Sequence, residues 1–197
     1  MRAGLAVAGI ALVLAGCATT APTPTPTATA APSRDSPTAS PVPVGSGGPV
    51  AIDPSLLEHL PAQVDGLDLM RRPESDAAAA TDPVVIAFGE GVVTALAVDP
   101  GTDDFAYAAV VRLREGTFSE ELFRSWRESF DEGACSQAGG VVRTAVTEID
   151  GRDVHIDSCE GGLRIYHAWL PNSRVLVSVS ALGERRLGEQ IVQELVD

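Results

Sequence analysis

The pattern of apolar and polar positions divides the chain into three parts. Residues 3–14 are an uninterrupted run of apolar residues and glycine. Residues 18–48 are almost all Thr, Ala, Pro and Ser. A segment of that composition cannot bury a core, so we expect it to be disordered. From residue 50 onward, apolar positions recur with the periods of helices and strands, which predicts a single folded domain over 50–197.

Two helices are predicted from apolar residues that recur every four positions. The stripe of the first helix comprises Phe118, Leu122, Trp126 and Phe130. The stripe of the second comprises Leu187, Ile191 and Leu195. Thr117-Phe118-Ser119-Glu120 is typical of a capping box that begins the first helix, and Gly133 is expected to end it. We expect its acidic residues to form a solvated surface: Glu120, Glu121, Glu128, Asp131 and Glu132.

Six strands are predicted from apolar runs and from the turns between them. The runs are 91–100, 103–114, 141–149, 152–159, 163–170 and 173–182. The turns are Pro100-Gly101, Asp150-Gly151, Glu160–Gly162 and Pro171-Asn172, of which Asp-Gly is the strongest hairpin signal. The order of a strand pair, a helix, four strands and a closing helix predicts an α+β fold. We expect a curved antiparallel sheet with helices packed on it, preceded by a disordered stalk.

Cys17 stands where the apolar run meets the Thr-Pro repeat. Met1-Arg2 and residues 3–14 have the form of a secretory signal, and the run falls short of the ~20 apolar residues that span a membrane. Leu14-Ala15-Gly16-Cys17 resembles a bacterial lipobox at all four positions. The resemblance implies cleavage after residue 16 and a diacylglycerol on the Cys17 sulfur. The alternative is an ordinary secreted protein with a chance cysteine at this position.

The lipobox sets the expected organisation and location. Residues 1–16 would be the lipoprotein signal peptide, and 17–49 would be the lipidated cysteine with its linker. A diacylglycerol gives stable anchoring because two acyl chains bury enough CH₂ groups. We therefore expect the protein to be lipid-anchored on the extracytoplasmic face of the cell membrane.

The charge of the chain argues against two classes of partner. It has 14 basic residues, all arginine, against 27 acidic residues, and a formal net charge of −13. Such a charge disfavours nucleic acid and electrostatic docking to anionic lipid. The membrane partner is therefore expected through the lipid on Cys17 alone.

Two cysteines remain once Cys17 is assigned to lipid. Cys135 and Cys159 are 24 residues apart, and an even pair in an exported protein predicts a disulfide. A loop of that length stabilises the fold by ~3 kcal/mol in the chain-entropy model. A redox-active or metal-binding pair is the alternative, and the absence of a C-x-x-C motif argues against it.

The second predicted hairpin carries the one polar constellation with a spacing that suggests chemistry. Strand alternation puts four residues on one face: Asp153, His155, Asp157 and Cys159. A three-residue loop at Glu160–Gly162 would place His155 opposite His167. Two imidazoles with a carboxylate suit Zn²⁺ or Cu²⁺. We expect a solvated polar face without a metal, and keep His155, Asp157 and His167 as candidate ligands.

Most of 60–197 resembles domains of uncharacterised actinobacterial envelope proteins. The resemblance rests on LPAQVDGLDL, AGGVVRTAVTEIDGRDVHI and YHAWLPNSRVLVSVSA, followed by a helix rich in Glu and Leu. It implies an envelope lipoprotein with an α+β domain, and it carries no functional residues. A more distant likeness to the Mog1/PsbP-like sandwich of other envelope lipoproteins implies the same class of fold.

The functional hypotheses follow from the anchor and from the motifs that are absent. The sequence has no G-x-S-x-G, H-E-x-x-H, P-loop or Gly-rich dinucleotide turn, so we expect no enzyme and no cofactor. The first hypothesis is a non-enzymatic domain that binds an envelope protein or glycan. The alternative is a small-ligand or lipid carrier with a pocket between the helices and the sheet.

The lipobox generates a direct test. Replacing Cys17 with Ala removes the sulfur that would carry the lipid, so the protein should move from the membrane pellet to the soluble fraction. Immunoblotting of fractionated cells measures this. A Cys17→Ala protein that still sediments with membranes would exclude the lipid anchor.

Overall fold

Residues 49–197 are described by a computed structural model. The signal peptide predicted for 1–16, Cys17 and the linker up to residue 48 lie outside these described residues. The helices are η1 Pro54–His59, α1 Pro73–Ala80, α2 Pro83–Phe88, α3 Glu120–Cys135 and α4 Leu187–Gln193. The strands are β1 Ala51–Ile52, β2 Gln63–Val64, β3 Leu67–Asp68, β4 Met70–Arg71, β5 Gly89–Val98, β6 Phe105–Leu113, β7 Val141–Ile149, β8 Arg152–Cys159, β9 Arg164–Leu170 and β10 Val175–Leu182.

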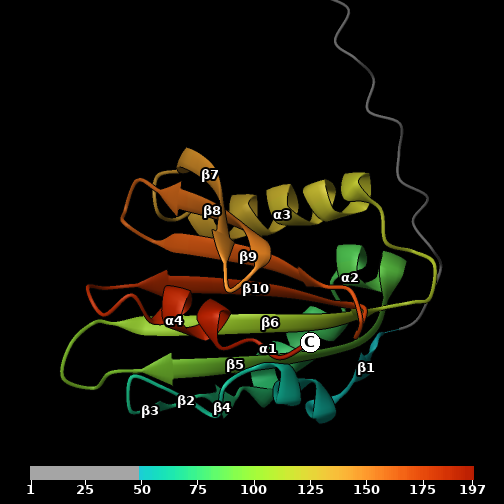
Figure 1. Ribbon diagram of the computed structural model, residues 1–197, viewed down its shortest axis with the longest axis horizontal. Coiled ribbons are helices and arrows are strands. Elements are labelled where there is room, and N and C mark those ends of the chain that lie inside the picture. The colour runs from blue at the N-terminus through green and yellow to red at the C-terminus, as the bar shows by residue number, and fades with distance from the viewer. Residues whose placement is uncertain (1–48) are drawn as a thin grey trace, which may run out of the picture. The chain divides into compact units, whose positions relative to one another are not determined.

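Eight of the strands form one sheet. Its order is β1-β5-β6-β10-β9-β8-β7, with β4 also paired to β5, and every pair except β1–β5 is antiparallel. In Figure 1, β7 runs steeply across the direction of β6 and β10, so the sheet is curved at this end. The prediction of an α+β fold with helices on an antiparallel sheet is confirmed.

Both faces of the sheet are covered, because apolar side chains alternate between them along each strand. On β5, Val93 belongs to a buried cluster with η1 and α4, whereas its neighbour Val92 belongs to a second cluster with α1, α2 and α3. These clusters and a smaller third one lie within 50–195. Among residues 49–197, no helix has the length and apolarity that a membrane crossing requires.

Helix α3 differs from its predicted form at both ends. The residue that caps it is Ser119, whose hydroxyl accepts a hydrogen bond from the Leu122 amide at 3.1 Å, so the capping box at Thr117 was wrong. The helix continues through Gly133 to Cys135. Gly133 keeps a helical φ, and the left-handed glycines that redirect the chain are Gly139 and Gly140. The buried face of α3 is formed by Phe123, Trp126, Asp131 and Cys135.

A disulfide joins the last residue of α3 to the last residue of β8. The Cα atoms of Cys135 and Cys159 are 5.3 Å apart, and both side chains are buried against Ile165. The predicted pairing is confirmed. The covalent bond holds the C-terminal end of α3 against the outer half of the sheet.

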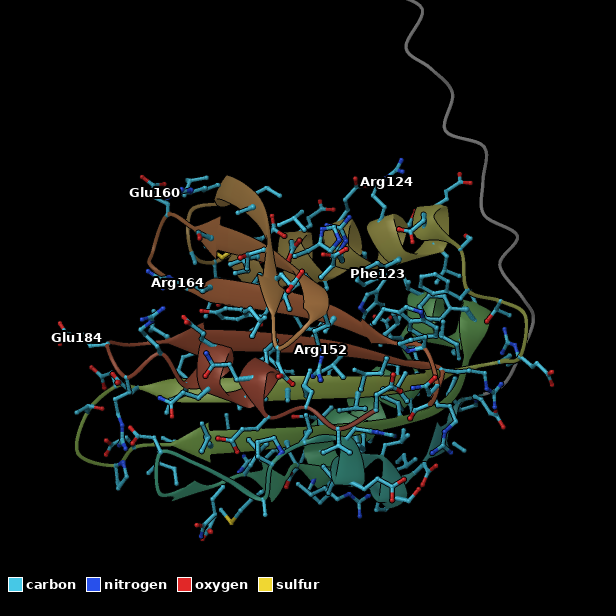
Figure 2. The ribbon with its side chains drawn as sticks, in the orientation of Figure 1. Phe123, Arg124, Arg152, Glu160, Arg164 and Glu184 are labelled. Carbon is cyan, nitrogen blue, oxygen red and sulfur yellow. A yellow bond between two sulfur atoms is a disulfide. The ribbon has the colours of Figure 1, made fainter. Side chains whose placement is uncertain are left out.

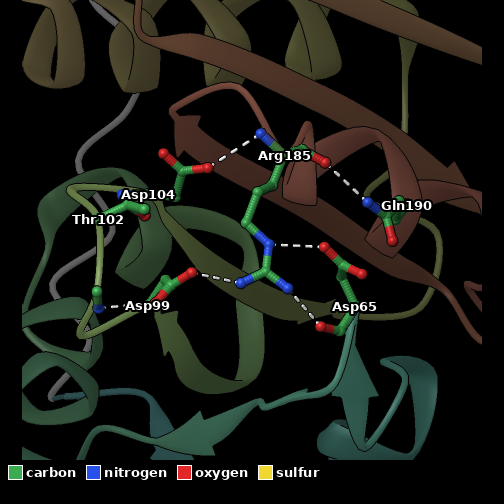
Figure 3. A network of polar contacts seen from close by, with 7 residues as sticks. Asp65, Asp99, Thr102, Asp104, Arg185 and Gln190 are labelled. Carbon is green, nitrogen blue, oxygen red and sulfur yellow. Dashed lines mark hydrogen bonds and ion pairs between the residues drawn. The ribbon is translucent and has the colours of Figure 1, made fainter.

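The segment that leads into α4 is fixed by an arginine at the centre of three carboxylates (Figure 3). The Arg185 guanidinium pairs with Asp65 at 2.6 Å and with Asp99 in the loop after β5. Its backbone amide donates to Asp104 at 3.0 Å, and its carbonyl accepts from Gln190 at 2.8 Å. These contacts tie the start of α4 to two loops distant in sequence, which sets where α4 crosses the sheet.

Gly188 in α4 lies where the helix approaches the sheet most closely. A Cβ built on Gly188 would lie 2.6 Å from the Tyr166 ring and 2.8 Å from the Ala181 Cβ. Neither contact is with a flexible side-chain tip. Only glycine therefore fits at this distance between helix and sheet.

The close contact predicts a loss of stability on enlarging this residue. Gly188→Ala should lower the free energy of unfolding by about 1–3 kcal/mol, as overpacked sites do. Gly133→Ala in α3 is the matched control, since its Cβ would meet nothing within 4 Å and should raise stability by about 0.5–1 kcal/mol. Urea unfolding of both variants measures the difference. Equal stability of Gly188→Ala and the natural protein would contradict the packing described.

Candidate functional site

Helix α3 covers the polar face of β8 and β9. The register places His155 opposite His167, as predicted from the three-residue loop. Asp157 and His167 are nevertheless buried, so the expectation of a solvated face was wrong. Asp131 is also buried and belongs to this cluster, contrary to the solvated helix surface expected for it. The sequence pattern did not indicate that α3 lies across these strands.

The buried polar groups under α3 form a continuous hydrogen-bonded network. The Trp126 indole N–H donates to the Ser178 hydroxyl at 2.9 Å, and Ser178 lies 2.8 Å from His167 Nδ1. His167 Nε2 lies 2.9 Å from Asp131 Oδ1. Because Ser178 accepts from Trp126, its own hydrogen is free for Nδ1, which leaves the Nε2 hydrogen to donate to Asp131. Every group in this row then has a partner.

Asp157 extends the network toward the edge of the sheet. Its carboxyl accepts from the Thr144 hydroxyl at 2.6 Å. Burial is the main cause that raises the pKa of Asp157 above its ordinary value of 3.8. The negative charge of Asp131 and hydrogen bonding with that carboxyl raise the pKa further. Hydrogen bonding from Thr144 and the nearby His167 oppose the rise. The neighbouring Asp131 carboxylate therefore disfavours the charged form of Asp157.

The structure changes the set of candidate metal ligands. Within 49–197, Asp131, Asp157 and His167 place one ligand atom each within 4.8 Å of one another, and His155 is not among them. His155 is half-buried with its ring edge-on to Phe123, and its pKa is lowered by burial, then by the charges of Arg127 and His167. That these residues bind no metal is still a prediction.

Ser178, His167 and Asp131 are the residue types of a hydrolytic triad, and they are hydrogen-bonded in a row. Catalysis requires that the serine oxygen reach a substrate. Ser178 and His167 have no exposed surface, and the hydroxyl is already bonded to Trp126. The cluster instead joins α3 to the sheet.

An open hollow lies on the opposite face, between α4 and strands β7–β9. Its volume is about 870 Å³, and we call it the arginine hollow. It is lined by Arg143, Ala145, Thr147, Glu148, Ile149, Asp150, Ile156, Ser158, Arg164, Tyr166, Arg186, Glu189 and Gln193. Helix α4 packs on Tyr166 of β9, which is buried, whereas Ala145 of β7 is exposed and Ile156 of β8 is half-buried. Pockets of this size are typical of small-ligand sites.

The strand register arranges the side chains that line the arginine hollow in rows across β7, β8 and β9. Arg143 pairs with Ser158, and Ser158 pairs with Arg164, so these three residues form one row across β7, β8 and β9. The next row on the same face is Ala145, Ile156 and Tyr166. The hollow therefore has a polar, cationic end followed by an apolar floor.

The arginines of this hollow differ in their partners. Arg186, from the start of α4, contacts the Glu189 carboxylate. In the part of the chain that the structure describes, Arg143 and Arg164 form no ion pair. Burial raises the pKa of Tyr166, while the neighbouring Arg164 opposes the rise. Both residues line the hollow.

Comparisons with known proteins assign no function to this chain, so its function is argued from the geometry of its sites. No protein-family model matches the chain, and no curated protein and no solved structure matches it. The likeness to actinobacterial envelope lipoproteins and to the Mog1/PsbP-like sandwich stays a prediction.

The raised pKa of Asp157 predicts a pH dependence of stability with a definite sign. Because its folded pKa is raised, its contribution to stability is complete below pH 3.8 and is lost as the pH rises through the folded pKa. The amide of Asp157→Asn can donate to Asp131 at every pH. The free energy of unfolding of the natural protein should therefore fall, relative to Asp157→Asn, as the pH rises.

Urea unfolding at a series of pH values from about 3 to 8 measures this difference. Asp153→Asn is the matched control, since Asp153 is an exposed carboxylate on the same face of the same strand. It should keep the natural pH profile. A constant difference between Asp157→Asn and the natural protein across the series would contradict the raised pKa of Asp157.

Proposed function

We propose that this chain is a lipid-anchored extracytoplasmic protein whose domain binds a small ligand in the arginine hollow, without catalysing a reaction. The observation that carries the proposal is the hollow itself. It is open to solvent, it has about 870 Å³ of space, and it combines polar groups at one end with an apolar floor. This favours the carrier alternative, in which the pocket lies between a helix and the sheet.

The anchor part of the proposal rests on sequence. Leu14-Ala15-Gly16-Cys17 follows a secretory apolar run, and 31 residues separate Cys17 from the first described residue, Pro49. A diacylglycerol on Cys17 would keep the domain at the membrane, where ligands of the envelope can reach it.

The cationic groups of the hollow support binding of an anionic ligand. Among the described residues that line it there is no histidine or cysteine to act as nucleophile or neutral-pH base. Its cationic groups are arginines, which remain charged and recognise carboxylate or phosphate through planar pairs of donors. Such groups orient a ligand and do not exchange protons with it.

A second candidate function is supported by the outer edge of the sheet. Among the strands of residues 49–197, β7 pairs with β8 alone, and Val142 and Val146 are 62% and 57% exposed. An exposed edge strand can pair with an extended segment of another protein. Binding of an envelope protein along β7 is therefore the alternative to a ligand in the hollow.

One pair of substitutions on β7 separates the two functions. Ala145 lines the hollow, whereas its neighbour Val146 points to the opposite face. Ala145→Trp should fill the hollow and exclude a ligand, and Val146→Trp should leave it open. Both residues are exposed, so neither change disturbs the core.

Native mass spectrometry of protein extracted from its own membranes measures the result. The natural protein and Val146→Trp should carry an added mass that Ala145→Trp lacks. If the added mass persists in Ala145→Trp, or if none is found on the natural protein, the hollow is not the ligand site.

A further inference from the structure

The chemical class of the ligand is indicated by the row Arg143, Ser158 and Arg164. Neighbouring strands lie about 4.8 Å apart, so the Cα atoms of the two arginines are about 10 Å apart with the Ser158 hydroxyl between them. Two arginine side chains can meet across that distance. A phosphate or carboxylate between them would accept charge-assisted hydrogen bonds from both guanidinium groups.

Two further groups reach the same end of the hollow. Arg186 comes from the start of α4, on the other side of the opening. Tyr166 lies two residues after Arg164 on the same face of β9 and lines the same hollow. Three strands and one helix therefore contribute donors to one place, and Arg185 fixes the helix through its contacts with Asp65 and Asp99.

The arginines gathered in the hollow are significant because the chain as a whole is strongly acidic. The chain has a net charge of −13, so carboxylates that could neutralise an arginine are plentiful. Arg143 and Arg164 are nevertheless without a carboxylate partner in the described domain. Figure 2 shows Arg164 at the end of the sheet, whereas Arg124 projects from α3.

A small inorganic anion would fill only the arginine end of the hollow. Ala145, Ile156 and Tyr166 form an apolar floor next to the arginine row, and Ile149 continues it. At the far end, Glu148 would repel a second negative charge, and Asp150 already pairs with Arg152 at 3.4 Å. An anion at one end and an apolar body along the floor match this distribution.

We propose that the arginine hollow binds an amphipathic anion, a molecule with one phosphate or carboxylate and an apolar chain. The anionic group lies between Arg143, Arg164 and Arg186, and the chain lies over Ala145 and Ile156 toward Ile149. This assignment rests on the proposed function, because it names the ligand of that same hollow.

Titration calorimetry with dodecyl phosphate, below its micellar concentration, tests the proposal. The protein is used without its first 17 residues, which leaves every residue of the three buried clusters in place. Dodecyl phosphate should bind one to one. Inorganic phosphate, which lacks the chain, and dodecyltrimethylammonium, which has the opposite charge, should each bind at least tenfold more weakly.

Variants locate the binding. Arg143→Gln combined with Arg164→Gln should weaken dodecyl phosphate binding at least tenfold, and Ala145→Trp should abolish it. Arg124→Gln removes an exposed arginine from α3 and should change nothing. The three arginines are exposed, and thermal unfolding verifies that each variant remains folded.

Several results would overturn the proposal. These are equal binding of the cationic and anionic dodecyl compounds, binding of inorganic phosphate as tight as that of dodecyl phosphate, or no effect of the arginine substitutions. Cosedimentation with phosphatidylglycerol vesicles, without binding of monomeric dodecyl phosphate, would also overturn it, since recognition would then need a bilayer. An added mass in native spectra that has no anionic group would refute this ligand class and leave the proposed function intact.

Discussion

The pairing of β10 with β6 on one side and β9 on the other is the interaction on which the rest of the structure depends. The hairpin β5–β6 and the meander β7–β8–β9 have no hydrogen-bonded strand contact with each other, and β10 joins them. Its ladders run from Val175 to Leu182 against β6 and to Ala181 against β9. The position of β10 also directs the chain into α4. The arginine hollow exists because α4 covers β10 and leaves the outer strands open.

The two faces of β10 pack against two different buried clusters. Val175, Val177 and Val179 face the apolar cluster under α4. Ser178, on the other face, accepts a hydrogen bond from the Trp126 indole N–H and contacts His167. An unpartnered polar group in that position would cost about 1–3 kcal/mol, so the polar network under α3 must be complete to be tolerated. It also fixes the position of α3, because apolar contacts alone would allow the helix to slide.

Local signals in the sequence predicted most of the fold. Asp150-Gly151 adopts the positive φ values that a tight hairpin requires, and the Glu160–Gly162 loop sets the register that places His155 opposite His167. The stripe of α3 predicted a helix but placed its buried face imperfectly. Asp131 was missed because a carboxylate on an acidic helix has no local feature that distinguishes a buried position from an exposed one. The row of Arg143, Ser158 and Arg164 follows from the two hairpin turns, but its openness depends on where α4 ends, which is a tertiary property.

The disulfide has a consequence for how the protein matures. Cys135 and Cys159 belong to α3 and β8, which lie close together in sequence, so the thiols can meet before the last strand of the sheet is in place. They are the two cysteines of the described domain, and two thiols have a single intramolecular pairing. Oxidation of this domain therefore needs an oxidant and no isomerase to correct mispaired bonds.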